Sequence, residues 1–186
     1  MAILAYSIFG LWFLSEIVVN RIYRSPESKH ESHDKGSLHF TWISAFLGNG
    51  FAIVSTIWFP IPILNGPLLV YIGLGLIVLG MIIRFIAISS LGKFFNVAVT
   101  IHSDHVLKTD GIYHYLRHPS YLGMLLEFMG FGISLNNWIS LASVALFMLP
   151  VMFYRIHIEE QALIEHFGAS YSDYMIRTKR ILPWIY

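Results

Sequence analysis

The chain has 186 residues, of which 56% are hydrophobic and only 12% are charged. A soluble domain carries about 25% charged residues, so this composition excludes a soluble globular domain and a disordered chain. The net charge of +1 excludes a nucleic-acid-binding protein with a basic surface, and the absence of cysteine excludes disulfides, thiolate metal sites and a cysteine nucleophile. The remaining class is an integral membrane protein, expected as a single domain over residues 1–186.

Five long apolar runs predict five transmembrane helices. A bilayer core requires about 20 apolar residues per helix, within a range of about 17–25. The last two runs are short and are joined by two asparagines, which predicts an antiparallel helical hairpin that just crosses the bilayer. The expected fold class is therefore all-α and polytopic, with spans at 3–20, 38–59, 67–89, 121–135 and 138–154.

The distribution of Lys and Arg predicts the topology. All twelve lie in the first loop, the third loop and the C-terminal tail, or at helix ends facing them. The loops at 60–66 and 136–137 carry none. Because basic loops remain in the cytoplasm, loops 1 and 3 and the C-terminus are expected to be cytoplasmic. With five spans, the N-terminus is then expected outside.

The C-terminal tail, residues 156–186, is amphipathic. Its apolar residues recur at near-helical spacing up to Gly168, which is expected to end a helix. Ser170 followed by Asp173 predicts a capping box that opens a second short helix. Together with the long third loop, 88–120, this tail is expected to close over the helix ends and form a cytosolic pocket.

Two patterns resemble ligand-binding motifs but have a structural explanation. The glycines at 73–80 lie inside an apolar span with no strand before them, so close helix packing explains them better than nucleotide binding. His114 and His118 have metal-ligand spacing, but Pro119 disfavours helical geometry at His118 and is expected to begin a helix. We therefore expect no metal site.

Glu127 lies inside the fourth predicted span. An ionisable side chain in a membrane is costly and by default indicates function. The alternative is that Glu127 pairs with a Tyr or His inside the helix bundle. Glu16, nearer the end of the first span, is less informative.

Polar residues are densest at the junction of the third loop and the fourth span, residues 111–123. A helix beginning there offers free backbone N–H groups. A second constellation is Arg155 with Glu159 and Glu160 at the inner end of the last span. Arg155 and Glu159 share a helix face, and an ordinary surface salt bridge is the alternative explanation for this pair.

These motifs together resemble the isoprenylcysteine carboxyl methyltransferase family and its broader relatives, which include membrane phospholipid methyltransferases. The resemblance covers about residues 84–186. A short hydrophobic hairpin separates the first motif from the second. The motifs are Arg117-His-Pro-Ser-Tyr121-x-Gly123, Arg155-x-x-x-Glu159-Glu160, Phe167-Gly168-x-x-Tyr171-x-x-Tyr174 and Arg180-Ile-Leu-Pro183-Trp-Ile-Tyr186.

The resemblance implies a membrane enzyme that transfers a methyl group from S-adenosylmethionine and releases S-adenosylhomocysteine. It implies a cofactor pocket built from the last helices and the C-terminal segment. Arg155 matches the family's substrate-orienting arginine and is the expected catalytic residue. The expected cofactor-binding residues are His105, Val106, Leu107, Lys108, Tyr113, His118, Pro119, Ser120, Tyr121 and Glu159.

The implied acceptor is a lipid or prenylated substrate that enters from the bilayer, with no role for nucleic acid. The expected reaction converts a prenylcysteine-type C-terminal carboxylate into a methyl ester. Such a carboxylate has a pKa of about 4 and is already ionised, so it requires alignment and a cation rather than a base. One alternative is a phospholipid amine, which needs a base such as Glu127, Glu160 or His118. A sterol-reductase-like NADPH enzyme, which ends in a similar pattern, is another.

Overall fold

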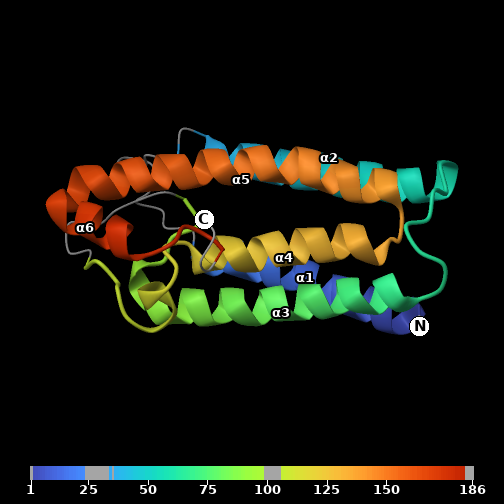
Figure 1. The fold of residues 1–186 in the computed structure, drawn as a ribbon, viewed down its shortest axis with the longest axis horizontal. Helices are drawn as coiled ribbons and strands as arrows, with labels where there is room; N and C mark the ends of the chain where they lie inside the picture. The colour runs from blue at the N-terminus through green and yellow to red at the C-terminus, as the bar shows by residue number, and fades with distance from the viewer. Residues whose placement is uncertain (1, 24–33, 35, 99–105, 183–186) are drawn as a thin grey trace.

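The structure is a computed structural model that describes residues 2–23, 34, 36–98 and 106–182. Across these residues it contains helices and no strand, and the long helices run side by side (Figure 1). The elements in chain order are α1 (Ala2–Ile22), α2 (Ser37–Trp58), α3 (Leu68–Leu91), the 3₁₀ helices η2 (Gly92–Phe94) and η3 (Gly111–His114), α4 (Pro119–Ser134), α5 (Trp138–Phe167) and α6 (Ala169–Arg177).

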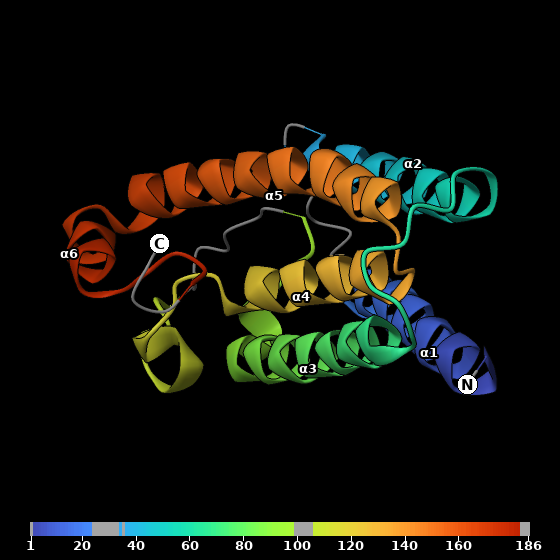
Figure 2. The ribbon, with the colours of Figure 1, turned by 45° about the vertical axis from the view of Figure 1, so that its right-hand side comes forward.

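The long helices form two layers. Helix α2 packs along α5 in one layer, whereas α1, α3 and α4 form the other, and α4 joins the layers by also packing against α5 (Figure 2). Their shared core is apolar and rich in aromatic and sulfur-containing side chains. It includes Trp12, Leu74, Ile77, Phe128, Phe131, Met148 and Met152.

Four helices are long and apolar enough to cross a membrane, namely Ile3–Ile22, Ser37–Trp58, Leu68–Phe94 and Trp138–Phe167. Helix α4 occupies the fourth predicted run but has only 16 residues. At 1.5 Å per residue it is about 24 Å long, shorter than the roughly 30 Å hydrocarbon core of a bilayer. The described residues therefore contain four candidate spans, whereas the sequence predicts five.

Helix α5 is much longer than the predicted fifth span, because it runs without a break from Trp138 to Phe167. Its 30 residues reach about 45 Å, so the expected tail helix is its last part. Gly168 ends α5 with φ 55, which confirms the predicted stop. Helix α6 begins at the next residue without a side-chain cap. The predicted capping box was wrong, because Ser170 already lies inside α6.

Glycines bring α3 and α4 into close contact, which confirms the packing interpretation for Gly73 and Gly80. The same interpretation was wrong for Gly75, where an added Cβ meets nothing within 4 Å among the described residues. A Cβ atom added to Gly80 would lie 2.6 Å from the carbonyl oxygen of Gly123, and one added to Gly123 would lie 2.7 Å from that of Gly80. Gly130 faces Gly73 in the same way, with a distance of 2.6 Å. Only residues without a Cβ allow this approach.

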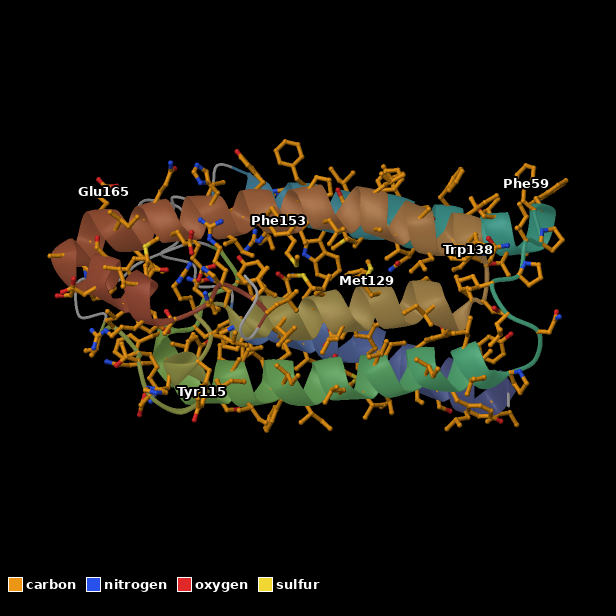
Figure 3. The ribbon with its side chains drawn as sticks, viewed as in Figure 1. Phe59, Tyr115, Met129, Trp138, Phe153 and Glu165 are labelled. Atoms are coloured by element: carbon orange, nitrogen blue, oxygen red, sulfur yellow. The ribbon has the colours of Figure 1, made fainter. Side chains whose placement is uncertain are left out.

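One end of the bundle collects the polar elements, and we call it the polar end. It carries the end of α1, the start of α2, the end of α3, the start of α4 and α6 (Figure 1). In Figure 3 the labelled Tyr115 and Glu165 lie at this end, and Phe59 and Trp138 lie at the other. The alternating directions of the helices therefore bring the loop-borne motifs together.

Candidate active site

A cavity of about 150 Å³ lies at the polar end. Every α-helix contributes to its walls, although the sequence motifs lie only in the second half of the chain. The helices α1 to α6 are represented there by Asn20, Thr41, Arg84, Tyr121, Arg155 and Tyr171. A ligand in this cavity would therefore touch both layers of the bundle.

Most of the predicted site residues line this cavity. Val106 does not line it, and its side chain is 64% exposed. Pro119 is buried as the first residue of α4 but is not part of the wall. His105 lies outside the described residues. The predicted residues in the wall are Leu107, Lys108, Tyr113, His118, Ser120, Tyr121, Arg155 and Glu159.

Arg155 is buried in α5, with only 5% of its surface exposed, which excludes a surface salt bridge as its explanation. Its Nη1 donates to Asp34 Oδ1 at 3.2 Å and to Ser37 Oγ at 2.9 Å. Its Nη2 donates to the carbonyl oxygen of Val97 at 2.7 Å. The guanidinium is therefore oriented by α2 and the segment after η2, and its ion pair is with Asp34.

Asp34 belongs to the loop before α2 and is itself buried. Ser37 Oγ donates to Asp34 Oδ1 at 2.8 Å, and the backbone N–H of Leu38 donates to Oδ2 at 3.1 Å. Free N–H groups in the first turn of a helix are normally satisfied by such an acceptor. One carboxylate thus stabilises the start of α2 and holds Arg155.

Glu160 anchors a second buried cluster beside the cavity. Its carboxylate accepts from Arg117 Nε at 3.1 Å and from Arg180 Nη2 at 2.7 Å, and its Oε1 lies 3.3 Å from His118 Nε2. Two arginines therefore neutralise Glu160. Glu160 is not part of the cavity wall. Its contact with His118 Nε2 instead holds the imidazole in place.

The segment after α6 runs alongside the residues before α4. Leu116 and Lys179 form a parallel bridge, in which the N–H of Arg117 donates to the carbonyl of Lys179 at 2.8 Å. The N–H of His118 donates to the carbonyl of Arg180 at 2.9 Å. These two hydrogen bonds to the C-terminal segment hold the backbone of Arg117 and His118, and both residues line the cavity.

Several polar atoms in the cavity wall are buried without a hydrogen-bond partner among the described residues, and they include Asn20 Oδ1, Asn96 Nδ2, His118 Nδ1 and the Tyr171 hydroxyl. Glu159 Oε1 lies 3.8 Å from His118 Nδ1, too far for a hydrogen bond. Burial raises the pKa of the Tyr171 and Tyr113 phenols, so both remain neutral donors. Unpaired buried groups cost about 1–3 kcal/mol each, and their position fits a polar ligand.

Two acidic side chains in the layer of α1, α3 and α4 have partners within that layer. Trp12 Nε1 donates to Glu127 Oε2 at 3.1 Å, so the partner of this glutamate is a tryptophan and not the expected Tyr or His. Glu127 is not part of the cavity wall. Arg84 Nη2 donates to Glu16 Oε2 at 3.0 Å, and both of these residues line the cavity.

Sequence reasoning missed the contribution of the N-terminal helices to this site. Asn20, Thr41 and Asp34 carry no motif, and the loop of Asp34 has the composition of a charged linker. One signal was available, because Glu16 and Arg84 are opposite charges in two apolar runs. Charges of opposite sign in neighbouring spans are expected to pair.

Comparisons with known proteins agree with this architecture. The family model described as "Isoprenylcysteine carboxyl methyltransferase (ICMT) family" matches residues 72–165. A relative from Schizosaccharomyces pombe, named protein-S-isoprenylcysteine O-methyltransferase, is 30% identical over 97% of this chain and 82% of its own length. A relative of the same name from Tribolium castaneum is 38% identical over 61% of this chain and 41% of its own length.

A solved structure shows that the similarity includes the fold of nearly the whole chain. It is described as the eukaryotic intramembrane Ras methyltransferase ICMT, and it matches with a TM-score of 0.66 and 30% identity. The match covers 98% of this chain and 68% of that one. The family match and the apolar helices identify an integral membrane protein, and the chain belongs to the isoprenylcysteine carboxyl methyltransferase family.

Proposed function

We infer that the chain methylates the C-terminal carboxylate of a prenylcysteine substrate, with S-adenosylmethionine as the methyl donor. The observation that carries this inference is a buried arginine, Arg155, in the wall of a cavity. The same wall also contains His118, Ser120, Tyr121 and Glu159. The named activity of the relatives supports the same reaction.

On the acceptor side, Arg155 supplies the cation. A prenylcysteine carboxylate has a pKa of about 4 and is ionised at neutral pH, so its oxygen attacks without prior proton removal. A guanidinium has five N–H donors, and the contacts to Asp34, Ser37 and Val97 leave at most two for a substrate. Arg155 would therefore orient the carboxylate by hydrogen bonds from a guanidinium that its own protein contacts already orient.

On the donor side, S-adenosylmethionine would supply an electrophilic methyl group on a sulfonium. Glu159 would accept hydrogen bonds from ribose hydroxyls or from the cofactor's ammonium group. His118 Nδ1 and the Tyr171 hydroxyl, which are buried and unpaired, would bond its remaining polar groups. Backbone groups at 107–108 would contact the adenine edge.

The contacts of Glu127 and Glu160 argue against either of them as the base that a phospholipid amine would need, whereas His118 keeps an unpaired Nδ1 in the cavity wall. A protonated amine must lose a proton before it attacks, which requires an available base. Glu127 lies outside the cavity wall and accepts from Trp12. Glu160 is neutralised by two arginines and in turn contacts His118.

We propose five membrane crossings, with α4 as the fourth, an external N-terminus and a cytoplasmic polar end. The turn between α4 and α5 supports this proposal, because it bonds the loop after α2. The backbone N–H of Leu64 donates to Asn136 Oδ1 at 3.1 Å, and Asn137 Nδ2 donates to the carbonyl of Phe59 at 2.6 Å. These uncharged loops would lie outside, and α6 with residues 178–182 would close the pocket on the cytoplasmic side.

The test is methyl transfer by the full chain in lipid nanodiscs, using S-adenosylmethionine with a labelled methyl group. N-Acetylated farnesylcysteine and phosphatidylethanolamine would be offered separately. We expect label on farnesylcysteine that mild base releases as methanol, as an ester requires. Base-stable label on phosphatidylethanolamine, or no transfer to farnesylcysteine by folded protein, would overturn the proposal.

A further inference from the structure

We propose that Asp34 is a positioning residue that pairs with Arg155 when no acceptor is bound and sets how strongly the site holds a substrate carboxylate. This inference rests on the proposed function. Asp34 lies outside the region matched by the family model, residues 72–165. The ion pair of Asp34 with Arg155 links the N-terminal part of the chain to the candidate active site.

The contact is buried on both sides. The side chains of Arg155 and Asp34 are only 6% and 9% exposed, and Nη1 lies 3.2 Å from Oδ1. Ser37 Oγ bonds both Arg155 Nη1 and Asp34 Oδ1, at 2.9 and 2.8 Å. Because solvent screens a buried pair little, the charge of Asp34 acts strongly on the guanidinium.

The charges around Arg155 make Asp34 a competitor of the substrate. One positive charge already faces the Asp34 carboxylate, and Glu159 lies one helical turn further along α5. A substrate carboxylate that binds Arg155 therefore shares this cation with a resident carboxylate and is repelled by it. Without the charge of Asp34, the acid substrate should bind more tightly.

The methyl ester product responds differently, because it carries no charge. It neither competes for the guanidinium nor is repelled by Asp34. The pair between Asp34 and Arg155 is then fully restored once the ester has formed. Asp34 should therefore weaken binding of the acid substrate while leaving binding of the ester product nearly unchanged.

The experiment measures dissociation constants for N-acetylated farnesylcysteine and for its methyl ester, with S-adenosylhomocysteine present. The variant Asp34→Asn removes the charge and keeps one side-chain acceptor oxygen, which can still accept from the backbone N–H of Leu38. We expect the acid to bind about tenfold more tightly, equivalent to about 1.4 kcal/mol. We expect the affinity for the ester to change less than about twofold.

Two controls separate charge from structure. Asp173→Asn makes the same chemical change at an exposed position of α6 and should leave both affinities unchanged. Asp34→Ser, which replaces the carboxylate with a neutral hydroxyl, should reproduce the tighter binding of the acid. It also keeps the proposal testable if Asp34→Asn does not fold.

Acid affinity that stays constant or falls in both Asp34 variants would overturn the inference. So would an equal gain for acid and ester, which would indicate an opened pocket instead of a removed charge. The wild-type protein tests the proposed function separately. Failure of wild type to methylate the acid counts against that function, whereas an unchanged acid-to-ester ratio in the variants counts against Asp34 alone.

Discussion

At the scale of single residues, the site depends on side chains that serve more than one purpose. Arg155 bonds a carboxylate, a hydroxyl and a backbone carbonyl through its two terminal nitrogens. The Glu160 carboxylate forms ion pairs with two arginines and contacts His118. Because these charges are buried, removing one partner leaves an uncompensated charge, a change that typically costs about 3–5 kcal/mol.

Arg155→Lys is the sharpest test of the arginine's geometry. Lysine keeps the positive charge beside Asp34, but a single ammonium group does not reproduce a planar guanidinium that holds three acceptors. We expect turnover of farnesylcysteine to fall about a hundredfold, because misplacement by about 1 Å has that effect. Affinity for S-adenosylhomocysteine, measured by calorimetric titration, should change less than about threefold. Equal losses of turnover and of cofactor affinity would contradict separate donor and acceptor roles.

At the scale of elements, the junction of α3 and α4 depends on facing glycines. Gly73 and Gly80 face Gly130 and Gly123 at backbone distance, in antiparallel order. Lipid tails are as apolar as the side chains, so close packing is what favours this association in a membrane. The junction holds α4 in the position from which His118 and Tyr121 reach the cavity.

Gly80→Ala should therefore destabilise the bundle, since its Cβ would lie 2.6 Å from the carbonyl oxygen of Gly123. We expect a loss of about 1–3 kcal/mol, as for other overpacked sites, and a lower melting temperature in detergent. Gly75→Ala is the matched control on the same helix, because a Cβ there meets nothing within 4 Å. The control should be neutral or slightly stabilising, because alanine favours helix by about 0.5–1 kcal/mol. Equal melting temperatures for the two variants would refute the packing account.

At the scale of the whole molecule, the alternating helices separate a polar end from an uncharged end. The loop 60–66 and the turn at 136–137 bond one another at the uncharged end. The Arg-His-Pro motif, Arg155 and α6 gather at the other. A water-soluble donor and a lipid acceptor would then meet where the bundle leaves the membrane.

Single cysteines test this arrangement, because the chain has no cysteine of its own. Asn65→Cys, in an exposed loop, should react with a membrane-impermeant maleimide in intact cells. Ser172→Cys, exposed on α6, should react only after the membrane is permeabilised. If α4 did not cross the membrane, both residues would lie on the same side, and both cysteines would label alike.

The helical runs could be predicted from the sequence, as could the breaks at Gly168 and Pro119 and the concentration of polar motifs near one end. These features follow from hydrophobicity and local backbone preference, which act over a few residues. Tertiary structure alone decided that α5 is continuous, that Glu160 anchors His118, and that Asp34 meets Arg155 across 121 positions of the chain. Such pairs depend on how the helices pack. A local sequence pattern in an apolar span therefore does not predict which residue a buried charge will contact.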